Sequence, residues 1–392
     1  MEECIPTKNT GLRGVTIAST KISDVDGQAG RLIYRGYLVQ DLAEKATFEE
    51  VCHLLLKEKL PSAAELVDFS AQLAAERDIP ASMIDALRTF PKNALPMDVL
   101  QAAVAILAQY DPDIRDAGRS AADRMAIRLI AKLATVLAVW GRLREGQDPV
   151  APRGDLSHAA NFLYMLTGEV PADDTARFFD VALLLHAEHS FNASTFAARE
   201  VASTRAHMYA AVAAAVGSLS GELHGGANVR VMEMLMNIGS RDAVEGYVKK
   251  ILDDGKKIMG LGHAVYKTDD PRAHILAPMA KTMGERRGEP QWYDISTHLE
   301  KVGKAEFKSR KGIDIFVNVD FYSASLYYSL GIPVDFFTPI FAIARISGWT
   351  AHVLEEQFAE AAPKPALYRP ESDYIGDYCG PDVCEYVPLN NR

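Results

Sequence analysis

Apolar residues recur at helical spacing along most of this 392-residue chain, and this periodicity is the feature that most constrains its fold. One window is expected to begin after Asp173-Asp174 and to carry on one face Phe178, Ala182, Leu185 and His189. A second covers 240–254 and ends at Gly255, a residue type common after helix C-termini. A third begins at Thr338-Pro339, a good cap followed by a residue suited to the first helical turn. The chain is therefore expected to be mainly helical.

A small β element is predicted near the start of the chain. Strand-like runs over 14–19 and 31–37 flank Asp26-Gly27, a dipeptide typical of hairpin turns. Beyond it we find no internal repeat, low-complexity tract or long linker, and the segment 143–154, which contains both proline and glycine, is expected to be an exposed loop. The predicted fold class is all-α with a small N-terminal β-hairpin.

Charge and composition exclude several function classes. The chain carries 42 Lys+Arg against 52 Asp+Glu, a formal charge of −10, whereas general nucleic-acid and anionic-membrane binders need a basic surface. The longest apolar stretches are too short or too interrupted to span a membrane, and the first residues lack a basic leader, so a cytoplasmic location is expected. Reduced thiols rather than a disulfide framework are expected for the four cysteines, Cys4, Cys52, Cys379 and Cys384.

The first segment whose residues could take part in catalysis reads Gly-Glu-Leu-His-Gly-Gly-Ala-Asn over 221–228. It precedes an amphipathic run over 229–238. Its glycines predict a tight turn into a helix, so His224 is expected beside a helix N-terminus, where the positive dipole end disfavours imidazolium. A neutral imidazole there can donate a hydrogen bond to a developing enolate. The alternative is a turn histidine with no role in chemistry.

The second segment, 260–272, reads Gly-Leu-Gly-His-Ala-Val-Tyr-Lys-Thr-Asp-Asp-Pro-Arg. The third glycine of a dinucleotide-binding G-x-G-x-x-G is missing and the preceding segment is helical, so that interpretation is weak, and no Walker A sequence occurs in the chain. Glycines here still let the backbone approach a ligand, with His263 close by. Taken alone, the segment favours a solvated loop histidine over a catalytic one.

The third segment, Asn318-Val-Asp320-Phe-Tyr-Ser323, lies ahead of an apolar helix. Asp320 is either the cap of that helix or a carboxylate base.

Further on, Phe341 and Arg345 are four apart on one helix and can line one pocket. Because the residues around Arg345 are apolar, its guanidinium needs a carboxylate or phosphate partner.

Two histidines that could ligate a metal, His186 and His189, are three apart on one predicted helical face. No third ligand is evident, and Glu188 does not complete an H-E-x-x-H motif. A polar contact or a substrate hydrogen bond is therefore expected for these histidines, and no metal site is predicted.

Taken together, these segments resemble the citrate synthase family. The matching pieces follow the family order along nearly the whole chain: His186-Ala-Glu-His189-Ser-Phe-Asn-Ala-Ser, Leu223-His-Gly-Gly-Ala-Asn228, Gly260-Leu-Gly-His-Ala-Val265, Asp270-Pro-Arg272, Asn318-Val-Asp-Phe-Tyr-Ser323 and Phe337-Thr-Pro-Ile-Phe-Ala-Ile-Ala-Arg345. The resemblance favours a catalytic role over the structural alternatives for His224, His263 and Asp320.

The resemblance implies a homodimer of two-domain helical subunits. A large domain is expected over 1–225 and 332–392, and a small domain over 226–331 that closes over the active site. The implied reaction is condensation of acetyl-CoA with oxaloacetate followed by thioester hydrolysis, with no tightly bound cofactor. The alternative within the family is 2-methylcitrate synthase, which uses propionyl-CoA.

The resemblance also implies residue roles. Asp320 would take a proton from the acetyl methyl group, neutral His224 would hydrogen-bond to the thioester oxygen, and His263 would bind and protonate the oxaloacetate carbonyl. Oxaloacetate would be held by His189, Arg272, Arg345 and Arg369, the last from the partner subunit, in a pocket lined by Phe341. CoA would be approached by Gly260, Leu261, Gly262, Lys267, Lys311 and Asn318.

Overall fold

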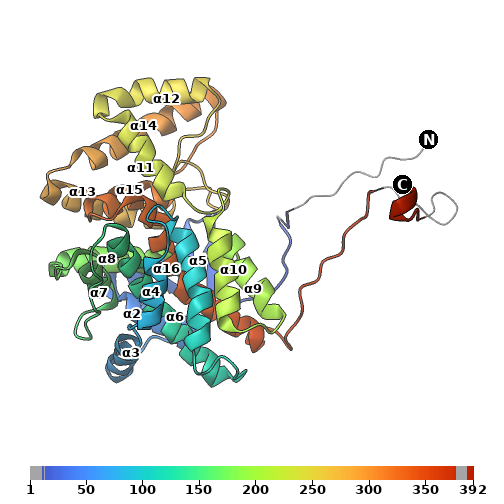
Figure 1. Cartoon of the computed structure of the whole chain (residues 1–392). Coiled ribbons are helices and arrows are strands. Elements are labelled where there is room, and N and C mark those ends of the chain that lie inside the picture. The colour runs from blue at the N-terminus through green and yellow to red at the C-terminus, as the bar shows by residue number, and fades with distance from the viewer. Residues whose placement is uncertain (1–10, 13, 377–385) are drawn as a thin grey trace.

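The computed structural model describes residues 11–12, 14–376 and 386–392, and this part of the chain is mainly helical (Figure 1). The helices are α1 (Val39–Lys45), α2 (Phe48–Lys57), α3 (Ala63–Ala75), α4 (Ala81–Arg88), α5 (Pro96–Leu107), α6 (Arg119–Arg144), α7 (His158–Thr167), α8 (Asp173–His186), α9 (Ala193–Ser203), α10 (Met208–Ser220), α11 (Ala227–Ile238), α12 (Val244–Asp253), α13 (Pro271–Arg287), α14 (Gln291–Lys311), α15 (Asp320–Ser329) and α16 (Phe337–Gln357). The predicted all-α class with a small β element is confirmed.

The β element is an antiparallel sheet of β1 (Ser23–Asp26), β2 (Arg31–Tyr34) and β3 (Tyr37–Leu38). The predicted turn after Asp26 is correct, because the Asp26 carboxylate accepts hydrogen bonds from the backbone N–H groups of Gln28 and Ala29 at 3.1 and 2.9 Å. The predicted strand over 14–19 is wrong: a tight turn pairs the residues immediately before and after it, so the first strand begins at Ser23.

The three predicted helices are present as α8, α12 and α16, with differences at their ends. α8 ends at His186, so His189 lies beyond it and does not share its face. Short 3₁₀ turns, Arg241–Ala243 and Val334–Phe336, wind directly into α12 and α16. Thr338 consequently lies inside the first turn of α16 and does not cap it.

Helices α11 to α15 gather at one end of the molecule, and the remaining helices form the other part (Figure 1). The core of that larger part is α16, which packs against α2, α6, α8, α9 and α10 and is buried along nearly its whole length. The chain leaves this part after α10 and returns to it at α16. The predicted domain boundaries at 226 and 331 remain a prediction.

Helices α9 and α13 begin with side-chain caps. Asn192 caps α9 through a hydrogen bond from the N–H of Thr195, and Asp270 caps α13 with Pro271 at the first helical position. These caps hold the chain just before each helix in one conformation.

Among the described residues, no helix combines the length and apolarity that a membrane span requires. Cys52 is a buried free thiol of α2. The other three cysteines, Cys4, Cys379 and Cys384, lie outside the described residues.

Candidate active site

One cavity of about 530 Å³ collects most of the residues singled out from the sequence. The members of that set that line it are His189, His224, Gly262, His263, Arg272, Asn318, Asp320, Phe341 and Arg345. They come from the loops that precede α9, α11, α13 and α15, from the first turns of α13 and α15, and from the N-terminal half of α16. Segments far apart in the sequence therefore converge on one space.

Five predicted residues do not line this cavity: Gly260, Leu261, Lys267, Lys311 and Arg369. The Leu261 side chain is buried and faces α14, where a Cβ added to Gly303 would lie 2.6 Å from its Cδ1. Lys311 ends α14 with its Nζ 4.8 Å from the ring centroid of Phe307. Lys267 and Arg369 are exposed. A CoA role for any of these side chains remains a prediction.

His224 is neutral and held in one tautomer. Its Nε2 accepts a hydrogen bond from the backbone N–H of Ser194 at 3.1 Å, so the ring proton resides on Nδ1. Burial, assisted by the charge of Arg345, lowers the pKa of His224 to about 4. The N–H that His224 accepts belongs to Ser194, the second residue of α9, while α11 begins three residues after His224, at Ala227.

The turn that carries His224 requires glycine. A Cβ on Gly225 would lie 1.9 Å from the carbonyl oxygen of Leu219, and Gly226 has φ +73°, in the left-handed region. The His-Gly-Gly sequence therefore folds this way because two consecutive residues must lack a side chain. The result is a histidine presented from a rigid turn.

His263 has the opposite tautomer. Its Nδ1 accepts hydrogen bonds from the backbone N–H groups of Val265 and Tyr266, at 3.0 and 3.1 Å, so Nε2 carries the proton and is free to donate. Burial, with a contribution from the charge of Arg272, lowers the pKa of His263 to about 4. The loop itself thus prepares a neutral hydrogen-bond donor.

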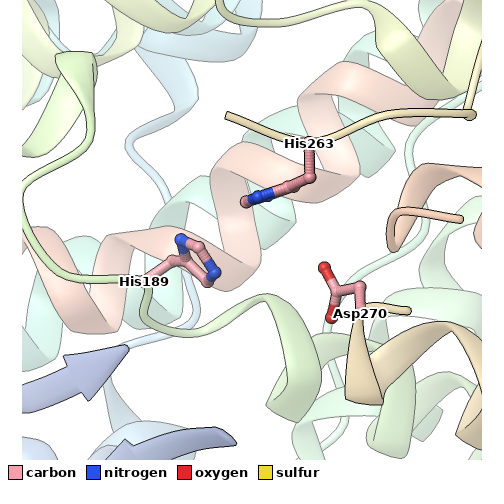
Figure 2. A group of neighbouring side chains, drawn as sticks. All are labelled: His189, His263 and Asp270. Atoms are coloured by element: carbon pink, nitrogen blue, oxygen red, sulfur yellow. The ribbon is translucent and has the colours of Figure 1, made fainter. Parts of the chain in front are cut away.

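His189, His263 and Asp270 point toward a common space from different segments (Figure 2). One potential ligand atom from each lies within 4.8 Å of the others, a spacing compatible with a metal ion. However, the Asp270 carboxylate already accepts three hydrogen bonds from Arg272, from its backbone N, its Nε and its Nη2, at 3.0, 2.9 and 2.6 Å. A cation here would meet this guanidinium, so the charge distribution favours an anionic or neutral ligand.

Arg345 is a buried cation that pairs with no carboxylate of the described residues. It is 1% exposed, its Nε donates to the carbonyl of His186 at 2.7 Å, and it forms no ion pair within the described part of the chain. Its guanidinium lies 4.6 Å from the ring centroid of Phe341. Burial lowers the pKa of Arg345 to about 10, opposed by the nearby Glu188 carboxylate. The predicted need for an anionic partner is therefore unmet by the described residues, and a ligand carboxylate can meet it.

Asp320 is the first residue of α15, and its side chain makes no capping hydrogen bond. The capping alternative is therefore wrong. Within the described residues this carboxylate accepts no hydrogen bond at all, and burial raises its pKa to about 6 against the opposing charge of Arg272. A carboxylate in this state is a stronger base than an ordinary aspartate and is still ionised at neutral pH.

The segment before α15 is tied to the glycine-rich loop. Asn318 N–H donates to the Gly260 carbonyl at 3.0 Å, and the Asn318 side-chain amide donates to the Gly262 carbonyl at 3.1 Å. The oxygen of this side-chain amide accepts a hydrogen bond from the backbone N–H of Asp320 at 3.1 Å. Asn318 therefore fixes Asp320 relative to the loop that carries His263.

Three supporting residues were not predicted as site residues: Ser194, Tyr266 and Asp270. Ser194 holds the His224 ring and accepts from the indole N–H of Trp349 at 3.1 Å, and the hydroxyl of Tyr266 lies 3.2 Å from Nε2 of His189. Asp270 carried the one available sequence signal, since an Asp-Pro pair is typical of a helix start. The roles of the other two depend on contacts that a motif does not encode.

Comparisons with known proteins identify the family. The family model described as citrate synthase, C-terminal domain, matches residues 11–371. The chain is 45% identical to a citrate synthase of Deinococcus radiodurans over 93% of this chain and 95% of the relative, and 42% identical to a 2-methylcitrate synthase of Mycobacterium tuberculosis over 95% and 91%. The structure is similar to citrate synthase of Thermoplasma acidophilum in a ternary complex with carboxymethyl coenzyme A and oxaloacetate, with a TM-score of 0.90, 31% identity, and coverage of 99% and 100%.

Proposed function

The chain belongs to the citrate synthase family of acyltransferases, and we propose that it condenses acetyl-CoA with oxaloacetate and water to give citrate and CoA. One observation carries the proposal. Among the described residues, one cavity is lined by a carboxylate without a hydrogen-bond partner, two neutral histidines of defined tautomer and a guanidinium without an ion pair.

The first half of the reaction is removal of a proton from the acetyl methyl group. Asp320 serves as the base, since its carboxylate is ionised at neutral pH and has no internal partner among the described residues. As the proton leaves, negative charge develops on the thioester oxygen. The Nδ1–H of His224 stabilises that charge by donating a hydrogen bond, and its low pKa keeps the ring neutral.

The second half is attack of the enol carbon on the oxaloacetate carbonyl carbon, which gives citryl-CoA. Water then hydrolyses the thioester of this intermediate and releases citrate and CoA. His263 donates from Nε2 to the oxaloacetate carbonyl oxygen and supplies the proton as the new bond forms. Arg345 binds one substrate carboxylate, because its two terminal nitrogens have no other acceptor within the described residues. Arg272, in the first turn of α13, adds positive charge to the site. His189 provides a further neutral polar contact.

The proposal includes a homodimer, a cytoplasmic location, and closure of the segment 226–331 over bound substrates. Arg369 would then act in the partner's site. Arg369 is exposed in the segment after α16, whose later part extends away from the helices (Figure 1), and this exposure supports the role. No tightly bound cofactor is proposed.

Acetyl-CoA is proposed over propionyl-CoA, the substrate that a 2-methylcitrate synthase would use. An added methylene changes binding by only about 1 to 3 kcal/mol, so the shared motifs do not separate the two. The test is release of the free CoA thiol from each acyl-CoA, with and without oxaloacetate. The proposal predicts oxaloacetate-dependent release with the higher kcat/KM for acetyl-CoA. A large preference for propionyl-CoA would establish the alternative, and no release from either would reject both.

A further inference from the structure

We propose that the β1–β2 hairpin is a strut that sets the positions of His189 and His263 relative to each other, with Gly27 and Gly30 as positioning residues at its tip. The hairpin does not line the active-site cavity. Its importance for catalysis rests on the proposed function, because that function needs both histidines on one substrate. The contacts described below are independent of the reaction.

The base of the hairpin holds the segment that leads to His189. The Ser23 hydroxyl donates to the buried Glu188 carboxylate at 2.9 Å and accepts from the backbone N–H of Ser190 at 3.1 Å. Directly across the sheet, the Tyr34 hydroxyl bonds to the Glu188 carbonyl at 2.8 Å. Both neighbours of His189 are therefore bound to paired residues of the hairpin.

The backbone of Ser190 has an unfavourable conformation that this attachment helps to hold. Its φ is +52°, in the left-handed region that residues with a side chain seldom adopt. The hydrogen bond from its N–H to Ser23 helps to hold this conformation. A rotation at Ser190 would redirect the chain immediately after His189.

The tip of the hairpin is packed against the loop that carries His263. The N–H of Lys267 donates to the Gly27 carbonyl at 2.8 Å. A Cβ on Gly27 would lie 2.3 Å from the Val265 carbonyl oxygen, and a Cβ on Gly30 would lie 2.5 Å from Cγ2 of Thr268. Both distances are too short for a real side chain, so each glycine permits a close approach between the two segments.

The contacted loop residues also orient the His263 ring. Val265, whose carbonyl faces Gly27, uses its N–H to bond Nδ1 of His263, and Tyr266 adds a second such bond. A loop displaced from the hairpin tip would carry these donors with it. The direction of the Nε2–H bond, which the mechanism aims at the oxaloacetate carbonyl, would then no longer be fixed.

The hairpin thus contacts the His189 segment at its base and the His263 loop at its tip. Four residue pairs of β1 and β2 connect the two contacts. The hairpin lies in the predicted large domain and the loop in the predicted small one. Docking of the tip accordingly defines the geometry in which the two histidines face each other, with ring centroids 5.5 Å apart.

The direct test is Gly27→Ala, in which the new methyl group meets the Val265 carbonyl. We expect kcat/KM for oxaloacetate to fall at least tenfold, mainly through a higher KM, while the thermal midpoint stays within about 2 °C of the wild type, because the hairpin base keeps its bonds. Gln28→Ala, at the exposed neighbouring position of the same turn, should match the wild type in both measurements. Wild-type kinetics in Gly27→Ala would overturn the proposal.

Gly30 offers a rescue experiment that separates loop contact from backbone strain. Gly30→Ala combines a left-handed φ of +64° with the clash against Thr268. Thr268→Ser removes Cγ2 and leaves Cβ at 3.9 Å, an ordinary contact. The double variant should recover most of the kcat/KM that Gly30→Ala loses. Equal losses in the single and double variants would mean that strain in the turn is the cause and would overturn the role of the loop contact.

A readout without catalysis distinguishes failure of this proposal from failure of the proposed function. Trypsin can cleave after the exposed Lys267, whose N–H is bound to Gly27. The peptide bond after Lys267 should be cleaved at least fivefold faster in Gly27→Ala than in Gln28→Ala or the wild type, with mass spectrometry as the readout of cleavage. Unchanged cleavage would refute docking even if the enzyme is active, and faster cleavage would support docking even if no CoA is released.

Discussion

Replacing Asp320 by Asn should remove the proposed base and at the same time stabilise the protein. Burial raises the pKa of this carboxyl from 3.8 to about 6, and within the described residues no hydrogen bond compensates its charge. A shift of about 2 units at about 1.4 kcal/mol per unit means that ionised Asp320 costs the folded state up to about 3 kcal/mol at pH 7.

The pH dependence of this effect has a definite sign. Because the folded-state pKa is raised, the stabilising contribution of the protonated carboxyl is complete below pH 3.8 and is lost as the pH rises through about 6. An amide has no such titration, so the advantage of Asp320→Asn should be largest at pH 7 and should fade toward pH 4. For 392 residues the unfolding entropy is about 0.8 kcal/mol per degree, so the midpoint should rise by about 2 to 4 °C at pH 7.

The assay pairs thermal unfolding at pH 7 and near pH 4 with CoA release at pH 7. We expect Asp320→Asn to lose about 10² to 10⁴ in kcat, the usual contribution of a positioned base. Asp85→Asn, which changes an exposed carboxylate of α4, should alter neither quantity. The reasoning fails if Asp320→Asn is no more stable than the wild type at pH 7, or if its kcat stays within tenfold.

Three further changes test other parts of the site. His224→Ala should lower kcat by about 10² to 10³, as expected for one lost donor at a developing oxyanion, with little change in KM for oxaloacetate, and steady-state kinetics will check both. Arg345→Lys keeps the charge but loses the planar fork, so KM for oxaloacetate should rise about tenfold or more; an unchanged KM would exclude Arg345 from carboxylate binding. Exhaustive chelation should leave activity intact, since Asp270 is committed to Arg272; loss of activity that added metal restores would overturn that reading.

Much of the fold follows from local signals in the sequence. Apolar periodicity located α8, α12 and α16, and Asp26-Gly27 located the hairpin turn. Helix ends were less predictable because tertiary partners decide them. α8 stops at His186 where the Tyr34 hydroxyl, more than a hundred residues earlier in the chain, bonds to the backbone of Glu188.

The site was predictable as a set of residue types and not as an arrangement. His224, His263, Asp320 and Arg345 stand out because ionisable groups sit in glycine-rich or apolar surroundings, and the structure brings them to one cavity. Their protonation states depend on distant partners such as Ser194 behind His224. No sequence pattern indicates which nitrogen of each histidine carries the proton.

The absence of partners was equally hidden from the sequence. Arg272 and Arg345 look alike as arginines near motifs, yet Asp270 neutralises the first, and the second has no ion pair among the described residues. Arg272 meets its partner locally, at the start of its own helix, whereas Arg345 is buried within α16 away from any carboxylate that could pair with it among the described residues. This difference identifies Arg345 as the cation most available to a substrate.

The dependence of kcat/KM for acetyl-CoA on pH tests the central claim most directly, namely that ionised Asp320 is the base. The pKa values of His224 and His263 are lowered to about 4, so Asp320, with its pKa raised to about 6, should set the acid limb of the profile. We predict that kcat/KM falls about tenfold per pH unit below an inflection near pH 6. A profile that stays flat from pH 7 down to pH 5 would contradict this account of the site.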